Sequence, residues 1–226
     1  MSTRVWFLTA AIATAAASTT ACSAGAPEAM PAASAGAESA AAKSASPEPD
    51  LDAVRAATER FQDVNVALAE GYIRDPFDLC DTAEMMGRPA ELGAMGVHYF
   101  RPDLLGITAP PNPKVTGNGT HTDFLQPAIL IYEPQADGGL TLVAVENLAF
   151  KTAWEAAGHT EPPSFHGVPY EHMMDDPATP ADEAHHFEPH YDRHVWLYRD
   201  NPNGMFAPFN PAVSCAHHTG ATHVGE

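Results

Sequence analysis

Histidine and aspartate alternate with bulkier residues along positions 190–199, HYDRHVWLYR. Side chains of a β-strand point to opposite faces in turn, so the alternation predicts a strand with two different faces. One face carries His190, Asp192, His194, Trp196 and Tyr198, and the other carries Tyr191, Arg193, Val195, Leu197 and Arg199. Two imidazoles and a carboxylate share the first face, which makes this strand the first candidate for a functional site.

Apolar residues recur at intervals of three and four between Asp50 and Gly71, the spacing of an amphipathic helix. They are Leu51, Val54, Ala57, Phe61, Val64 and Leu68. Asp50 is a suitable N-cap, and Gly71 is a suitable terminator. The pattern predicts one long N-terminal helix whose apolar stripe packs on a sheet.

Three further apolar runs, at 95–100, 128–133 and 140–146, predict strands. The turn signal Asp137-Gly138-Gly139 separates the last two, which predicts an antiparallel hairpin. Alternation along 140–146 places Leu140, Leu142, Ala144 and Glu146 on one face. An unpaired buried carboxylate is costly, so Glu146 needs solvent, a donor or a cation.

Together these patterns predict a single α+β domain over residues 50–216, with a small antiparallel sheet of about four strands. One long N-terminal helix packs on the sheet, and long loops occupy 101–127 and 151–189. We expect a helical turn at 81–86 and a short helix at 152–157. A chain of 226 residues, 45% of them hydrophobic, can bury one such core.

Residues 1–21 have a basic residue, Arg4, followed by a short apolar run and small residues, as in a signal peptide. The last four residues of the stretch ending at Cys22, TTAC, resemble a bacterial lipobox, in which the cysteine is lipidated. Ala24-Gly25-Ala26 equally fits ordinary cleavage after Ala26, and both interpretations stay open. We therefore expect an exported protein: a periplasmic or cell-envelope lipoprotein, or a secreted protein.

Two segments lack the residues needed to bury a core. Residues 22–49 contain no aromatic residue and predict a disordered tether, and the polar residues 217–226 predict a disordered tail. Membrane contact is expected only through a lipid anchor at Cys22.

The charge balance is strongly acidic, with 11 Lys and Arg against 29 Asp and Glu, a net charge of −18. Such a field repels phosphate backbones, which argues against nucleic-acid binding, and it attracts cations. Acidic surfaces also simply keep proteins soluble, so the charge alone does not identify a ligand.

Cys22 leaves the pool of free thiols by either processing route, which leaves Cys80 and Cys215 as an even pair. In an oxidising compartment such a pair favours a structural disulfide. Two separate buried thiols are the alternative.

Three motifs together resemble those of a family of exported bacterial proteins of unknown function. They are MGVHY at 95–99, VAVEN at 143–147 and HYDRHVWLYRDNPNGMFAPFNPAVSC at 190–215. The family reads MG-H-Y, VEY and HYDLHVWLW-NP-GMFAPWNP-VSC, so this chain departs from it at Asn147, Tyr198 and Phe209. The resemblance covers patches between Ala56 and Cys215. It implies export and no particular reaction.

The candidate site is a divalent transition metal ion held by some of His98, Glu146, His194 and His190. Positions 190 and 194 of a regular strand lie about 13 Å apart, so both cannot bind one ion. His194 is the better ligand, because His190 follows Pro189 at the start of the strand. The alternative is that His98 and His194 are core histidines bonded to carboxylates or backbone. His185-His186 and the tail histidines are expected in solvated loops.

Three classes of function remain open: a metal-binding envelope protein, a metal-free His/Glu acid–base hydrolase or lyase, and a structural or ligand-binding lipoprotein. Nucleophilic catalysis is disfavoured, because no Gly-x-Ser-x-Gly elbow occurs and both mature cysteines are expected to pair. Neither a substrate nor an oligomeric state follows from the sequence.

Overall fold

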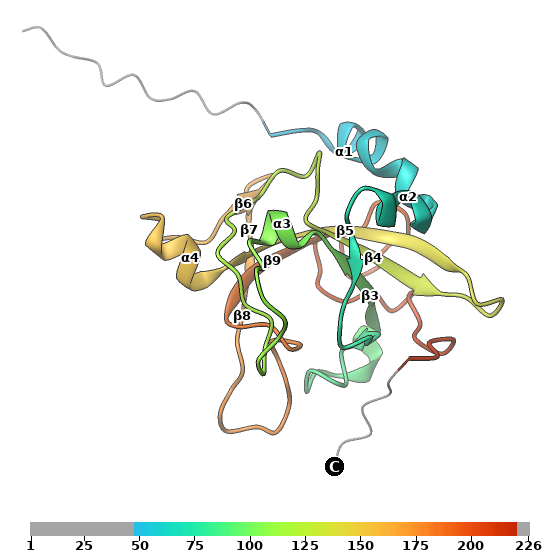
Figure 1. Cartoon of the computed structure of the whole chain (residues 1–226). Helices are drawn as coiled ribbons and strands as arrows, with labels where there is room; N and C mark the ends of the chain where they lie inside the picture. The colour runs from blue at the N-terminus through green and yellow to red at the C-terminus, as the bar shows by residue number, and fades with distance from the viewer. Residues whose placement is uncertain (1–47, 221–226) are drawn as a thin grey trace, which may run out of the picture. The chain divides into compact units, whose positions relative to one another are not determined.

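An antiparallel sheet runs through the part of the chain that the computed structural model describes, residues 48–220 (Figure 1). Its strand order is β1-β3-β4-β5-β9-β8, and β2 pairs with β3 off this path. The strands are β1 (Ile73–Arg74), β2 (Asp81–Thr82), β3 (Ala94–Phe100), β4 (Ile129–Pro134), β5 (Leu140–Phe150), β8 (Glu171–Met173) and β9 (His190–Val195). A separate hairpin pairs β6 (Ser164–Phe165) with β7 (Val168–Pro169).

The α+β class is confirmed, but the sheet has seven strands instead of about four. The four predicted strands correspond to β3, β4, β5 and β9. The three additional strands have only two or three residues each, too few to show any periodicity in the sequence. The helical turn expected at 81–86 is wrong, because Asp81 and Thr82 form β2 along the edge of β3.

The single long N-terminal helix is also wrong. The chain forms α1 (Leu51–Thr58), a 3₁₀ turn η1 (Glu59–Gln62) and α2 (Val64–Ala69). Asp63 has an extended backbone, and its side chain accepts a hydrogen bond from the Asn65 N–H, so it caps α2 and breaks the helix. The short helices are η2 (Ala90–Leu92), α3 (Pro102–Leu105) and α4 (Lys151–Ala156), the last close to the helix expected at 152–157.

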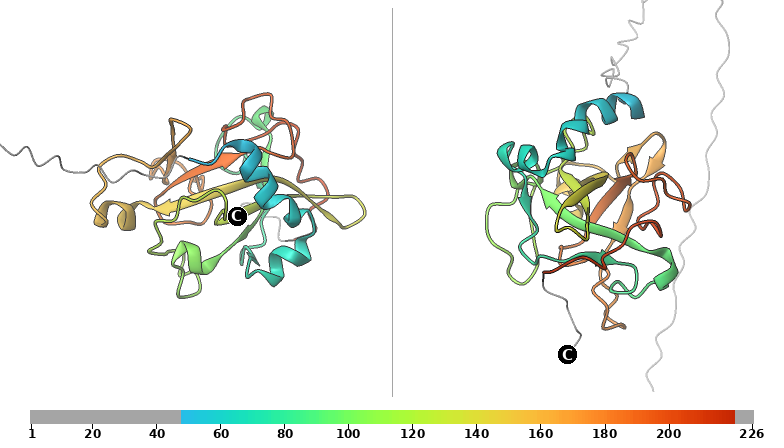
Figure 2. Two further views of the ribbon diagram at one scale, coloured as in Figure 1. Left: turned by 90° about the horizontal axis from the view of Figure 1, so that it is seen from above. Right: turned by 90° about the vertical axis from the view of Figure 1, so that its right-hand side faces the viewer.

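One face of the sheet packs against the segment α1–α2, as the apolar stripe predicted, except that Leu68 is 48% exposed (Figure 2). Val54, Phe61 and Ala67 contact a layer of sheet residues that includes Tyr99 and Val195. Beyond Leu197 the predicted alternation ends, because Tyr198 turns toward the helices, where its hydroxyl lies 2.8 Å from the Thr58 hydroxyl.

The second face of the sheet carries the polar residues of interest. Its apolar part includes Phe100, Ile129, Ile131, Leu148 and Trp196. The helix α3 contributes Leu105, and the loops contribute Val115 and Phe187, to cover it. A bulge between β4 and β5 pairs Ile131 with Ala144 but Tyr132 with Leu142. Ala144 and Glu146 therefore lie on the second face while Leu142 packs on the first, which corrects the single face expected for 140–146.

The disulfide Cys80–Cys215 is present and joins residues separated by 135 positions (Cα–Cα 5.7 Å). It fixes the segment that leads into β2 against the C-terminal segment. No helix within residues 48–220 is long and apolar enough to cross a membrane.

Several predictions fall on residues that the structure does not describe. The signal peptide, Cys22, nearly all of the tether and the end of the tail at 221–226 lie outside residues 48–220. In the described part of the tail, His218 has defined partners: its Nε2 lies 3.5 Å from Asp78 Oδ1 and 3.2 Å from an Arg74 nitrogen.

Candidate metal centre

Three predicted site residues meet on the second face of the sheet. Glu146 on β5 and His194 on β9 occupy directly paired positions, and His98 reaches the same point from β3. Glu146 Oε2 lies 3.4 Å from His98 Nε2 and 3.6 Å from His194 Nε2. All three side chains are at most 1% exposed.

These separations match those of ligands around one small ion. Two atoms each about 2.1 Å from a tetrahedral ion lie roughly 3.4 Å apart. One ligand atom from each of His98, Glu146 and His194 falls within 4.8 Å of the other two. An ion could therefore contact all three without moving the strands.

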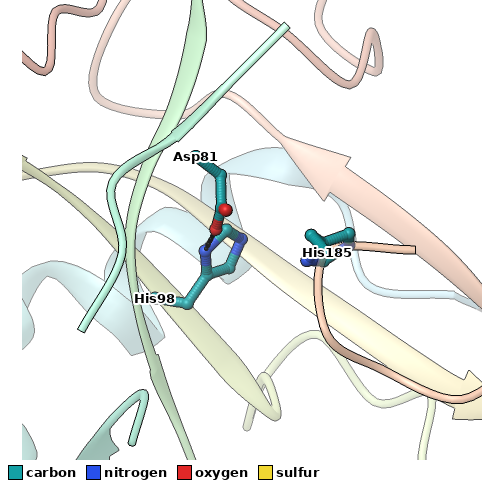
Figure 3. Close-up of side chains that lie close together, drawn as sticks. All are labelled: Asp81, His98 and His185. Atoms are coloured by element: carbon teal, nitrogen blue, oxygen red, sulfur yellow. Dashed lines mark ion pairs between the residues drawn. The ribbon is translucent and has the colours of Figure 1, made fainter. Parts of the chain in front are cut away.

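Asp81 is a site residue that sequence reasoning missed. Its Oδ2 lies 2.9 Å from His98 Nδ1 (Figure 3), while Glu146 contacts the other ring nitrogen, Nε2. A carboxylate on one ring nitrogen fixes a histidine with the other nitrogen toward a metal. Asp81 reaches this position because it follows the disulfide-bonded Cys80 and pairs in β2 with Gly96 of β3. Its place next to a cysteine was the only signal in the sequence.

His190, the fourth predicted ligand, lies away from these three residues. It pairs with Phe150 at the start of β9, four residues before His194, so the strand spacing keeps the two imidazoles apart as expected. It instead lies with His185 and Asp192, whose ligand atoms fall within 4.8 Å of its own. The expectation that His185 is solvated is wrong: the residue is 4% exposed, and its ring lies beside that of His98 (Figure 3).

The three groups share neighbours and form one buried cluster, which consists of Asp81, His98, Glu146, His185, His190, Asp192 and His194. Many of its buried polar atoms lack hydrogen bonds. Within residues 48–220, the atoms without one include His98 Nε2, both Glu146 oxygens, His194 Nε2, His190 Nε2, Asp192 Oδ2 and both nitrogens of His185. Buried polar groups are nearly always hydrogen-bonded, so this concentration at one place requires an explanation.

The electrostatics of two of the three residues, Glu146 and His194, suit a cation. Burial alone would raise the pKa of Glu146, but the imidazoles of His194 and His98 hold that pKa below its ordinary value. Burial lowers the pKa of His194 to about 4, which leaves its ring neutral at pH 7. Burial also opposes charge on His98, but Asp81 and Glu146 outweigh it and hold the pKa of His98 well above its ordinary value. The ring of His98 is therefore protonated in the metal-free protein, and an ion that binds Nε2 must displace this proton. A carboxylate and a neutral imidazole are the protonation states that metal ligands need.

A cavity of about 340 Å³ adjoins the cluster. It is lined by Leu79, Asp81, Met85, Met86, Pro180, Ala181, Asp182, His185 and His186. Asp81 and His185 belong both to the cavity wall and to the cluster, so they separate the buried groups from the outside.

No family model, curated protein or solved structure matches the chain in comparisons with known proteins. What the site does must therefore be argued from its own geometry and chemistry.

Proposed function

We propose that this protein is an exported protein that binds a divalent transition metal ion between His98, Glu146 and His194. The observation that carries the proposal is the convergence of three buried ligand atoms within 4.8 Å, none of them hydrogen-bonded within the described residues. Asp81 orients His98 for this role from the opposite side of the ring.

The free energy of burial supports an ion at this place. A buried carboxylate costs several kcal/mol unless a cation or donors compensate it. Glu146 is fully buried, and the nearest groups offered to it are two imidazole nitrogens at 3.4 and 3.6 Å. A divalent ion between these atoms would satisfy all three ligands at once.

The ligand types narrow the choice of metal. Two imidazoles and one carboxylate suit zinc, iron, copper or nickel, whereas calcium and magnesium prefer all-oxygen sites. Three protein ligands also leave a coordination position open, as in catalytic zinc sites; structural zinc sites have four. We therefore propose an open site for one of the imidazole-preferring metals.

A metal-free His/Glu acid–base pair is the second candidate. The contact between His98 Nε2 and Glu146 Oε2 favours it, because it brings an acid and a base together in a buried place. A substrate would have to reach these two groups, yet both are at most 1% exposed and neither lines the adjoining cavity. An ion needs far less room, so metal binding accounts better for the burial.

Export is part of the proposal. The disulfide is compatible with an oxidising compartment, and the resemblance to exported bacterial proteins points the same way. A lipid anchor at Cys22 and release after Ala26 remain the two candidate forms. Radiolabelled palmitate incorporation, compared between the full chain and Cys22→Ala, distinguishes them.

Equilibrium dialysis of the full chain against Zn²⁺ tests the ion. We expect tight binding that falls by one equivalent in Glu146→Gln and in His194→Ala. His172→Ala is the matched control, because His172 is an exposed histidine on the neighbouring strand β8. Absence of bound Zn²⁺, Co²⁺, Ni²⁺, Cu²⁺ and Mn²⁺ above background in the wild-type chain would overturn the proposal in favour of a metal-free site.

A further inference from the structure

We infer that His185, His190 and Asp192 form a second site for a divalent transition metal ion, next to the one proposed above. The inference goes beyond the proposed function, since the two sites share no ligand. Like the first set, this one consists of two imidazoles and a carboxylate, a combination that suits zinc and iron and leaves open positions.

The strand β9 presents two of the ligands. His190 and Asp192 are two residues apart and therefore share the second face, on which His190 Nε2 lies 3.9 Å from Asp192 Oδ2. His185 comes from the loop before β9, and its ring centroid lies 5.3 Å from that of His190. One ligand atom from each residue falls within 4.8 Å of the others.

The hydrogen bonding of His190 directs a lone pair into this group. Its Nδ1 lies 2.9 Å from the carbonyl oxygen of Glu188, which can only accept, so Nδ1 carries the proton and donates it. Nε2 of the neutral ring is then an acceptor that faces Asp192. A backbone carbonyl that fixes the tautomer in this way is the usual partner of a metal-ligating histidine.

The three side chains are buried and several of their polar atoms lack hydrogen-bond partners, which argues against a purely structural role for these residues. His190 and Asp192 are at most 1% exposed and His185 is 4% exposed. Within the described residues, His190 Nε2, Asp192 Oδ2 and both ring nitrogens of His185 make no hydrogen bond. Apolar residues at these positions would avoid that cost, whereas an ion would remove it.

The loop before β9 has a strained backbone at the residue that supplies the third ligand. His185 and His186 have φ values of +37° and +70°, a left-handed conformation that costs non-glycine residues about 1 kcal/mol or more each. The turn directs His185 inward, while His186 Nδ1 contacts Asp182 Oδ2 at 2.6 Å. Lys114 contacts Asp175 and Asp182 at 2.6 and 3.0 Å, which anchors the loop. Strain of this kind is typical of functional positions.

The second ion would be the more accessible of the two. His185 lines the cavity of about 340 Å³, whereas His98, Glu146 and His194 do not. His185 also lies near His98, with ring centroids 5.6 Å apart and nearly parallel rings. A small ligand that enters the cavity could therefore reach the second ion directly at His185, whereas the first site meets the cavity only through Asp81, the partner of His98.

A Co²⁺ titration of the full chain, followed by its visible absorption, tests the inference. We expect saturation at two equivalents in the wild type and at one in His190→Ala, Asp192→Asn and Glu146→Gln. His172→Ala should keep two. His185→Gly should also lose one; because glycine accepts a positive φ, this variant removes the imidazole without straining the turn. Far-UV circular dichroism confirms that each variant is folded.

The outcomes separate the two sites. One equivalent in the wild type, lost in Glu146→Gln but kept in His190→Ala and His185→Gly, overturns the second site and leaves the proposed function standing. One equivalent with the opposite dependence supports the site at His185, His190 and Asp192 and overturns the proposed function. Saturation below one equivalent in the wild type overturns both.

Discussion

Glu146 and His194 are directly paired residues on adjacent strands, and their side chains meet with Oε2 and Nε2 3.6 Å apart. The backbone register of β5 and β9 therefore fixes the distance between a carboxylate and an imidazole in the interior of the protein. Because hydrogen bonds along both strands hold this register, the two side chains already have this separation in the metal-free protein. Pre-organisation of this kind favours tight binding.

Binding of Zn²⁺ should stabilise the fold. An ion that binds only the native state at 100 times its dissociation constant adds about 2.7 kcal/mol. For a domain of this size the melting temperature should rise by roughly 5–10 °C. Differential scanning calorimetry with Zn²⁺ and with EDTA measures the shift, and in Glu146→Gln it should be clearly smaller. Equal shifts in Glu146→Gln and the wild type would place the binding elsewhere.

Asp81→Asn should weaken binding at the first site without removing it. Asp81 contacts His98 Nδ1 at 2.9 Å and acts only through that ring, so it is a positioning residue. Loss of such a partner typically costs 10–100-fold in metal affinity. Competition with a chromophoric chelator should show this loss at unchanged stoichiometry. A variant that loses the ion entirely would show that Asp81 is itself a ligand.

Reduction of Cys80–Cys215 should destabilise the domain and loosen the site. The bond closes a loop of 135 residues, for which the chain-entropy model gives about 3–5 kcal/mol. Since Asp81 directly follows Cys80, the reduced protein should also bind Zn²⁺ more weakly. Urea unfolding of the wild type and of Cys80→Ser/Cys215→Ser, each with EDTA, gives the stability difference. An unchanged midpoint would contradict a structural role for the bond.

Asp75→Asn should stabilise the metal-free protein at neutral pH. Burial raises the pKa of Asp75 from 3.8 to about 6, even though the Phe77 N–H favours the charged form. The folded state therefore binds the proton more tightly than the unfolded state, and stability falls as pH rises from about 4 to about 6. The difference between these pKa values corresponds to roughly 3 kcal/mol at pH 7.5. Asparagine keeps the acceptor for Phe77 and carries no charge.

Urea unfolding at pH 7.5 and pH 4, with EDTA present, measures the effect. Asp75→Asn should raise the midpoint at pH 7.5 and leave it nearly unchanged at pH 4. The exposed Glu91→Gln is the control for removal of one negative charge. A gain of equal size at both pH values would show that burial of the charge is not its cause.

Periodicity alone predicted the four main strands, and it predicted the faces of β9 and of the two residues that follow it, because each strand has enough residues to show its alternation. The ligand types of their side chains made His98, Glu146 and His194 the predicted partners. Periodicity could not predict the break at Asp63, since the apolar spacing continues through it and only the extended backbone reveals the second cap. A local cap competes with helix continuation, and the pattern does not say which prevails.

The residues missed at the site come from segments without periodicity. Asp81 depends on a two-residue strand, and His185 depends on a left-handed turn in a loop. Asp192 lies on the face that the alternation predicts, but its partner His185 comes from a loop whose position the alternation does not predict. These positions depend on how loops pack against distant strands, and the spacing of residues along the chain does not predict that packing.

Anomalous diffraction at the zinc edge, from crystals of the full chain grown with Zn²⁺, tests the metal centre most directly. We expect a peak on the second face of the sheet, about 2.0–2.2 Å from His98 Nε2, a Glu146 oxygen and His194 Nε2. Peaks confined to exposed histidines such as His159 and His172, with none between β3, β5 and β9, would contradict it.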